Sequence, residues 1–240
     1  MQANWYQEQA LILNEYMGFI ILIGIALFTG ILWQIPIGKI ILYPLTLLST
    51  WYHEMAHGLM VLILGGNFKK LEIFANGSGL ARYEHPNSLF SKPIGKVLIS
   101  AAGPMGPPII GASFIWVSRS WQTSQNILVV LSSLMLISVL IWVRTWIGIL
   151  VISLLGLIIL GIGLQASPEI QVFTTQFLGV QACISTFRDF NYVFRYCEGN
   201  SDTAKIAEVL LLPHWFWGIL IVITSIFLLI QSLRFAYFLN

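Results

Sequence analysis

The chain consists of long apolar segments separated by short polar stretches. Seven such segments follow one another, at residues 16–36, 38–66, 94–118, 126–145, 146–166, 170–188 and 213–234. Each is close to the roughly 20 residues that an α-helix needs to cross a bilayer. The fourth and fifth are separated only around Arg144, so one of them could be re-entrant. The pattern predicts an all-α polytopic membrane protein with about seven transmembrane helices in a single integral membrane domain, residues 1–240.

A short stretch between the second and third apolar segments has the pattern of a β-sheet. Residues 68–75 are rich in β-forming side chains, residues 76–79 read Asn-Gly-Ser-Gly, and residues 80–85 return to a strand-like pattern. Asparagine and glycine tolerate the positive φ angles of tight turns. We therefore expect a β-hairpin over residues 68–85, with Leu71, Ile73 and Ala75 on one face. A two-stranded ribbon is marginal alone, so it should lie on the membrane surface or against the helices.

Composition excludes a water-soluble globule. Hydrophobic residues make up 57% of the chain and charged residues only 9%, whereas soluble proteins carry roughly 25% charged residues. Lipid must therefore cover the surface, and the bilayer is the first expected partner. The net charge is only +2 and the basic residues form no run, so we expect no nucleic-acid partner. The oligomeric state is not indicated.

The distribution of basic residues predicts an orientation. With seven spans, nine basic residues fall on the side of the amino terminus: Lys69, Lys70, Arg82, Lys92, Lys96, Arg144, Arg188, Arg195 and Lys205. The opposite side receives Lys39, Arg119 and Arg234. Because Lys and Arg accumulate in cytoplasmic loops, this bias predicts a cytoplasmic amino terminus and a carboxyl terminus on the other side.

The second apolar segment contains the motif H-E-x-x-H, formed by His53, Glu54 and His57. On a helix, residues four apart return to nearly the same face, so both imidazoles can bind one tetrahedral zinc ion. Zinc lowers the pKa of water, and Glu54 stands where it can take the proton as a general base. The alternative is polar packing between helices. Because ionisable residues in a span are costly unless they are partnered, we favour a metal site.

A hydrolytic zinc usually has three protein ligands, and few residues can supply the third. The chain contains two aspartates, Asp189 and Asp202, and both precede the last span. Asp202 could instead cap a helix, and Asp189 could pair with a neighbouring arginine. Two further histidines are available: His85, in a predicted surface turn before a proline, and His214, at the head of the last span. Spacing alone does not choose between the two aspartates.

The third apolar segment carries a run of glycine and proline, Gly103-Pro104-Met105-Gly106-Pro107-Pro108-Ile109-Ile110-Gly111. Small residues allow close approach of neighbouring helices, and proline interrupts a helix where a neighbour or a cavity satisfies the freed carbonyls. The run therefore predicts either close packing or a path for substrate and water.

Together these motifs resemble the site-2 protease family of intramembrane zinc metalloproteases, in its compact bacterial and plastid branch without a PDZ insert. The H-E-x-x-H motif, the basic hairpin, the Gly-Pro run, and Ser201-Asp202-Thr203-Ala204 followed by Pro213, Trp215 and Trp217 carry the resemblance. It implies zinc bound by His53, His57 and Asp202, with Glu54 as catalytic base. It also implies regulated intramembrane proteolysis of a membrane protein with a transmembrane segment, in a bacterial inner membrane or a thylakoid or other plastid membrane.

The chain departs from the family pattern at two places. Neither Asn-Pro-Asp-Gly nor Leu-Asp-Gly surrounds an aspartate, and Pro107 stands where many members have asparagine. These departures leave oxyanion stabilisation unassigned and keep two alternatives to the zinc metalloendopeptidase open. One is a catalytically silent chaperone or assembly factor of the same fold. The other is a carrier of metal ions or protons whose histidines form a transit site.

Overall fold

The computed structural model describes residues 2–84, 93–187 and 201–238, with side chains described from residue 17 onward. His85, Asp189, Arg188 and Arg195 lie outside the described residues. The helices and strands, in chain order, are α1 (Gln2–Leu32), α2 (Pro36–Ile41), α3 (Tyr43–Ile63), β1 (Asn67–Ile73), β2 (Gly79–Glu84), α4 (Pro93–Val117), α5 (Trp121–Ile141), α6 (Trp146–Gln165), α7 (Pro168–Ile184), the 3-10 turn η2 (Ser185–Phe187), α9 (Asp202–Leu210) and α10 (His214–Phe238).

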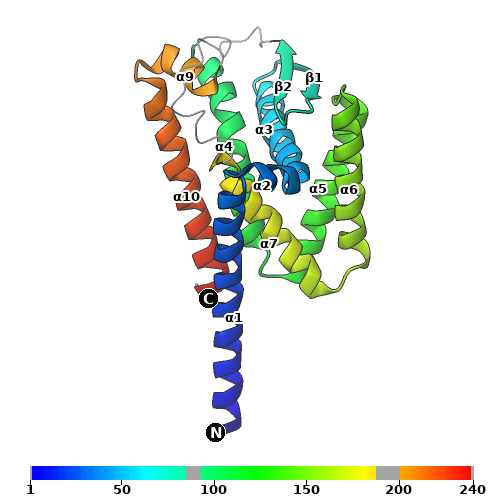
Figure 1. Ribbon diagram of the computed structural model, residues 1–240, viewed down its shortest axis with the longest axis vertical. Coiled ribbons are helices and arrows are strands. Elements are labelled where there is room, and N and C mark those ends of the chain that lie inside the picture. Colours follow the sequence, from blue (N-terminus) through cyan, green and yellow to red (C-terminus); the bar gives the residue numbers. More distant parts are fainter. Residues whose placement is uncertain (1, 85–92, 188–200, 239–240) are drawn as a thin grey trace.

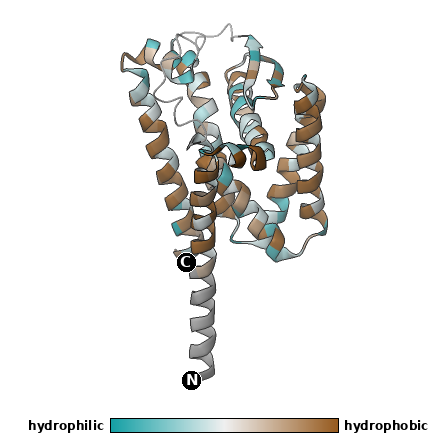
Figure 2. Cartoon of the chain, in the orientation of Figure 1, coloured by the Kyte–Doolittle hydropathy of each residue, from teal (hydrophilic) through white to brown (hydrophobic). Residues whose placement is uncertain are grey.

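The helices form one bundle whose long axes run broadly in the same direction (Figure 1). Within the described residues, α4, α5, α6 and α10 are long and apolar enough to cross a membrane, and they indicate a membrane protein. Apolar residues colour these helices along most of their length, whereas hydrophilic residues gather at the hairpin end (Figure 2). In α1 the side chains are described from Met17 onward, and Met17–Leu32 is there a shorter apolar helix. The predicted count of seven spans is therefore not confirmed.

The amino-terminal helices do not fold back on one another as two separate spans. In Figure 1, α1 rises to about half the height of the bundle, α2 lies across it, and α3 continues toward the hairpin. Pro36 begins α2 and Pro44 lies in the first turn of α3, which are positions where proline starts a helix. As a result, both chain ends lie away from the hairpin end (Figure 1). The predicted placement of the two termini on opposite sides is not supported, because both chain ends lie at the end of the bundle away from the hairpin (Figure 1).

The predicted hairpin is present and lies against α3. Its strands are antiparallel, with a register shift between Phe68 and Lys70. Its turn reaches the beginning of α3, where the Tyr43 hydroxyl donates to the carbonyl of Ala75 over 2.8 Å. Leu71 and Ile73 share a face, as predicted, and both are fully buried. Ala75 is exposed in the turn, because the strand ends at Ile73.

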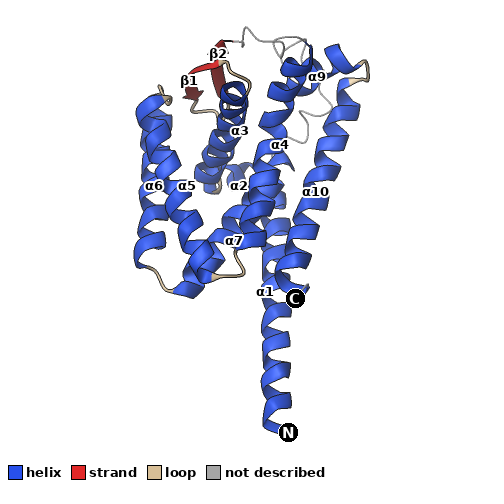
Figure 3. Ribbon diagram, turned by 180° about the vertical axis from the view of Figure 1, so that it is seen from behind, coloured by secondary structure: helices blue, strands red, loops and turns tan. Residues whose placement is uncertain are grey.

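The far edge of β1 is closed by the linker between α5 and α6. The amide of Leu71 donates to the carbonyl of Trp142 over 2.8 Å, and the amide of Arg144 donates back to Leu71 over 3.0 Å. The hydroxyl of Thr145 accepts from the amide of Ile73. In a bilayer each unpaired backbone group is costly, so these contacts allow strand β1 to lie beside the helices. Figure 3 shows the hairpin beside α3 at this end.

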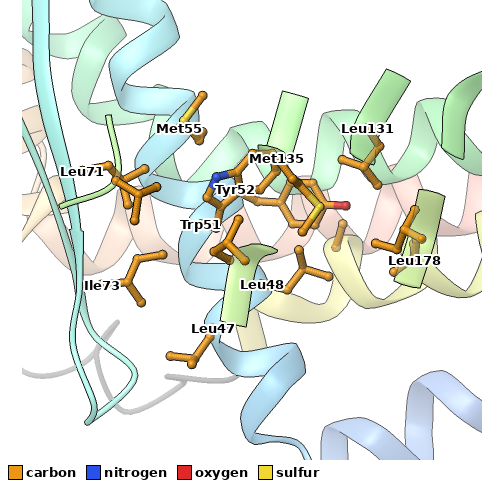
Figure 4. Packing of buried hydrophobic residues seen from close by; sticks show 14 of the residues in the cluster. Leu47, Leu48, Trp51, Tyr52, Met55, Leu71, Ile73, Leu131, Met135 and Leu178 are labelled. Atoms are coloured by element: carbon orange, nitrogen blue, oxygen red, sulfur yellow. The ribbon is translucent and has the colours of Figure 1, made fainter. Parts of the chain in front are cut away.

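The main hydrophobic core lies between α3, the hairpin and the pair α5–α6. Figure 4 shows Trp51 and Met55 of α3 facing Leu71 on one side and Met135 on the other. The indole of Trp51 donates to the hydroxyl of Ser138 on α5 over 2.8 Å. Burial of this face of α3 fixes the rotation of the helix, and hence the direction in which its other face points.

Candidate metal centre

The two histidines of the H-E-x-x-H motif lie side by side on α3, as their spacing predicts. Their ring centroids are 4.8 Å apart with the rings nearly perpendicular. The Nε2 atoms of His53 and His57 are 3.1 Å apart. His57 is buried, whereas the His53 side chain is about one third exposed. The pair is therefore open to solvent on the His53 side only.

Asp202 completes the group from the opposite side of the bundle. Ser201 caps α9, because its hydroxyl accepts from the amide of Ala204 over 3.1 Å, and this places Asp202 in the first helical turn. The Oδ2 atom of Asp202 lies 3.0 Å from Nε2 of His53 and 3.3 Å from Nε2 of His57. Asp189 and His85 lie outside the described residues. In the described part of the chain, His214 does not join the group.

The geometry of these three side chains fits a tetrahedral metal ion. Their ligand atoms all lie within 4.8 Å of one another. Donor atoms around a zinc with bonds of about 2.0–2.1 Å are roughly 3.3 Å apart, close to the distances found here. The other carboxylate oxygen of Asp202, Oδ1, faces Lys205 at 3.7 Å, which leaves Oδ2 as the single atom that Asp202 directs at the histidines.

The tautomer of His57 also fits a metal ion. Its Nδ1 atom lies 2.6 Å from the carbonyl oxygen of Ile99 on α4. Since a carbonyl only accepts, Nδ1 carries the hydrogen, and neutral imidazole then presents a lone pair at Nε2. That lone pair points at an imidazole nitrogen and a carboxylate oxygen. A cation shared by three such donors removes the repulsion, and a backbone carbonyl on the far nitrogen is the usual support for a metal-binding histidine.

The charges in the group act on Asp202. Burial by itself raises the pKa of the Asp202 carboxyl, but hydrogen bonds from His53 and His57, which for His57 require the protonated ring, outweigh it, so the pKa is lowered; a metal ion in place of those protons acts in the same direction. Asp202 is therefore an anion at neutral pH, the form that binds a metal.

Glu54 is held beside the group by the hairpin. Its residue exposure is 8%, and its Oε2 atom accepts from the amide of Ala81 on β2 over 2.7 Å. A Cβ on Gly79 would lie 2.6 Å from Cγ of Glu54. The absence of a side chain at Gly79 therefore leaves room for the Glu54 side chain. The amide of Ala81 points away from β1 and toward the site, which orients Glu54 without using the β-ladder.

Gly103 brings α4 against the two histidines. A Cβ at this position would overlap Nε2 and Cε1 of His57 and would stand 2.8 Å from Nε2 of His53. One turn further, a Cβ on Gly106 would overlap Ala56 of α3. The Gly-Pro run thus packs closely, as one of its two readings predicted, and it does so at the metal-capable group.

A cavity of about 560 Å³ opens from this group. Its lining includes His53, Glu54 and Asp202 together with Pro104 and Pro107 of α4. The turn of the hairpin, residues 76–79, forms another wall. The second reading of the Gly-Pro run, a path for substrate or water, is therefore compatible with the same surface.

Sequence reasoning missed the Ile99 carbonyl, the Ala81 amide and the specific tasks of Gly79 and Gly103. Backbone groups leave no trace in side-chain motifs. For Gly103 the signal was present, since a glycine before a proline in a span marks close approach, but only packing shows what approaches.

The comparison with protein families agrees with this site. A model of the family described as Peptidase M50B-like matches residues 21–232, and the chain belongs to that family. Comparisons with curated proteins and with solved structures found no significant match. The family and the His53–His57–Asp202 group together support a metal-binding membrane protein of the peptidase type.

Proposed function

We propose that this protein is an intramembrane zinc metalloendopeptidase that hydrolyses a peptide bond of a membrane protein. The observation that carries the proposal is the convergence of His53, His57 and Asp202 within 4.8 Å, beside Glu54 and at the wall of a cavity. Zinc held there supplies Lewis-acid activation of water and of the scissile carbonyl. Zinc is favoured among metals by the two imidazoles and one carboxylate, a ligand set common in hydrolytic sites.

The side chains divide the work between binding and proton transfer. His53, His57 and Asp202 hold the ion, and the Ile99 carbonyl keeps Nε2 of His57 free for it. Glu54 accepts a proton from the attacking water and returns it to the leaving amine. Its hydrogen bond from Ala81 uses Oε2 and leaves Oε1 for this transfer.

A membrane-protein segment is the proposed substrate, and β2 is the element suited to hold it. One edge of β2 pairs with β1, and the other bears the Ala81 amide that faces the site. A helix must unwind before its carbonyls can be attacked, because they are already bonded. An unwound strand could add to this edge of β2 through the backbone groups other than the Ala81 amide, which Glu54 occupies. The alternative role of the hairpin, which we weigh equally, is contact with lipid, in which Lys69 and Lys70 bind anionic headgroups.

The direct test is metal content and cleavage of the full chain. Wild type should contain about one zinc per chain, Asp202→Asn should lose it, and Glu54→Gln should keep it while losing cleavage by about 100-fold or more. Asp202→Asn is matched in size, so it removes charge with little change in packing. Wild type without zinc, or full activity of Glu54→Gln, would contradict the proposal.

Pro107 favours a second function, a catalytically silent chaperone or assembly factor. It lines the cavity where many relatives of the site-2 type carry asparagine, and proline has no polar side-chain atom. In that case Glu54→Gln would leave the cellular phenotype intact while removal of the hairpin abolishes it. A carrier would instead show zinc flux in proteoliposomes, which wild type and Glu54→Gln should share.

We also propose that the hairpin end faces the cytoplasm. Lys69, Lys70, Arg82, Lys96, Arg144 and Lys205 belong to elements at this end, whereas Arg119 packs over Phe235 near the other. The positive-inside rule then assigns the hairpin to the cytoplasmic side and both termini to the opposite side. A bacterial inner membrane or a thylakoid membrane remains the proposed location.

A further inference from the structure

The cavity at the metal-capable group extends to a lysine on α2. Lys39 is the one lysine or arginine that the described lining of this cavity contains. It precedes α3, and α3 rises roughly 15 Å from its first residue, Tyr43, to His53, at about 1.5 Å per residue. The cavity therefore connects a positive charge to the metal-capable group over a distance that several residues of an extended peptide would span.

The packing of α2 fixes the side on which Lys39 lies. Gly38 packs on the end of α1, where a Cβ would overlap the backbone carbonyl of Leu32. The isoleucines of α2 are strongly exposed and lie outside the cavity lining: Ile37, Ile40 and Ile41. Their exposed apolar surface indicates lipid on that side, and α2 lies at about half the height of the bundle (Figure 1). Lys39 thus brings an ammonium group to the cavity at membrane depth.

Within the described side chains, no carboxylate pairs with Lys39. In the cavity, Glu54 accepts from the Ala81 amide. Asp202 faces the two histidines and Lys205. The other described acids pair with basic residues of the hairpin or α4, or lie at the beginning of α7: Glu72, Glu84, Glu208 and Glu169. A cation at membrane depth is costly without a partner, and a ligand in the cavity can supply the negative charge.

Two ordinary roles of a lysine do not account for this position. Lys39 lies in the last turn of α2, where a cation stabilises the carbonyl end of a helix, but that contact needs no cavity. A lysine near the end of a span can extend its charge to the headgroups, but α2 lies at half height, with apolar surface around it. The cavity is the polar environment that the ammonium group has.

We propose that Lys39 is a specificity-determining residue that binds the carboxylate of a glutamate or aspartate in the substrate segment. The proposal rests on the proposed peptidase function and deepens it, because it names a chemical feature of the substrate. An extended chain rises about 3.3 Å per residue, so the acidic residue stands roughly three to five residues from the scissile bond. Acidic side chains are rare in transmembrane segments, because they are costly in lipid. Lys39 therefore selects the few segments that carry one.

The test uses peptide hydroxamates with the zinc-loaded full chain in dodecyl maltoside, an uncharged detergent. The hydroxamate binds zinc, and the attached peptide is apolar except for one glutamate, placed about two to seven residues from the hydroxamate. Matched peptides carry glutamine or lysine in its place. One series of peptides extends from the amino side of the hydroxamate and the other from its carboxyl side, so that both chain directions are sampled.

Calorimetry measures the affinities of wild type, Lys39→Met and Lys39→Glu for these peptides. Methionine keeps the length of the lysine side chain without its charge, and glutamate reverses the charge. Lys69→Met is the matched control, since Lys69 pairs with Glu84 over 3.1 Å on the hairpin, outside the cavity lining.

We expect wild type to bind the best glutamate peptide about tenfold more tightly than its glutamine counterpart, because the pair adds a charge-assisted hydrogen bond. Lys39→Met should bind both peptides equally, and Lys39→Glu should prefer the lysine peptide. Lys69→Met should keep the preference of wild type. Equal affinity of wild type for glutamate and glutamine peptides at every spacing would overturn the proposal. A glutamate preference that persists in Lys39→Met would also overturn it.

Two further ligands separate the remaining outcomes. Acetohydroxamate has no peptide, so its binding by wild type supports the metal site whatever Lys39 does. If wild type does not bind it, the metal site is refuted, and the proposed function and the role of Lys39 fail together. Phosphatidylglycerol added to the micelles offers a lipid phosphate as the anion. If it abolishes the glutamate preference of wild type, Lys39 binds lipid headgroups and the substrate proposal is wrong.

Discussion

Gly103 occupies the place on α4 where any side chain would enter the pair formed by His53 and His57. The two histidines were predictable because their spacing along one helix is local in sequence. Asp202 was singled out only through family resemblance, since 145 residues or more separate it from the histidines. Gly103 could not be assigned its task, because that task depends on how closely two distant helices approach.

Substitution of Gly103 by alanine should displace the metal ligands. The added Cβ overlaps His57, so we expect zinc affinity to fall at least about tenfold, as it does when support for a metal ligand is lost. Gly161→Ala on α6 is the control, since its Cβ would meet nothing within 4 Å. Competition with a chromophoric chelator measures the affinity, and circular dichroism checks the helices. Equal zinc affinity in both variants would show that α4 yields at this contact.

Strand β2 acts on the site through a backbone group, the amide of Ala81. Ala81→Pro removes the amide that holds Glu54 but no bond of the β-ladder, because that amide points away from β1. We expect kcat to fall about tenfold or more while zinc content is unchanged, since removal of an orienting hydrogen bond affects the base alone. Ala81→Gly keeps the amide and should retain activity. If kcat falls as much in the glycine variant as in the proline variant, the stiffness of the strand is responsible and not the hydrogen bond.

An ionised side chain on the outer face of the hairpin should make the stability of the hairpin depend on pH. Hydrogen bonds from Arg82 and then Lys70 hold the pKa of the Glu72 carboxyl below its ordinary value of 4.5. A lowered folded-state pKa adds stability that is complete above the unfolded pKa and is lost as pH falls through the folded one. We expect the protection factors of the hairpin amides, which remove the intrinsic pH dependence of exchange, to fall as pH drops below about 4.5. Glu72→Gln should remove this pH dependence. If the variant showed the same pH dependence as wild type, another group would be responsible.

At this scale the sequence predicted the hairpin and its turn, because alternation and Asn-Gly are local signals. It did not predict the pairing of β1 with the linker at Trp142 and Arg144. That linker looked like a break between two spans, and its backbone bonds to Leu71 depend on the long-range packing of α5 and α6.

Over the whole molecule, the apolar pattern predicted where most helices lie but not how often the chain crosses the bilayer. Segments 16–36 and 38–66 each had the length of a span, yet α1, α2 and α3 continue toward the hairpin instead of folding back on one another (Figure 1). Hydropathy records the length of an apolar segment and not the direction in which the chain continues after it.

This arrangement predicts which surfaces share a compartment. In a chain whose native cysteines are replaced, Lys69→Cys on the hairpin and Ser120→Cys between α4 and α5 should react with an impermeant maleimide from opposite sides of sealed vesicles. A tag on the amino terminus should be digested from the same side that labels Ser120→Cys. Digestion of the tag from the side that labels Lys69→Cys would refute this arrangement, because the amino terminus and the hairpin would then share a side.

The prolines inside α4 have a consequence for hydration. Pro104, Pro107 and Pro108 have no amide hydrogen, so the carbonyls of Ser100, Gly103 and Pro104 do not receive the donor that an uninterrupted helix gives them. Such acceptors at membrane depth attract water wherever a cavity admits it. Pro104 and Pro107 line the cavity, so α4 would offer acceptors there to water, the co-substrate of the proposed hydrolysis.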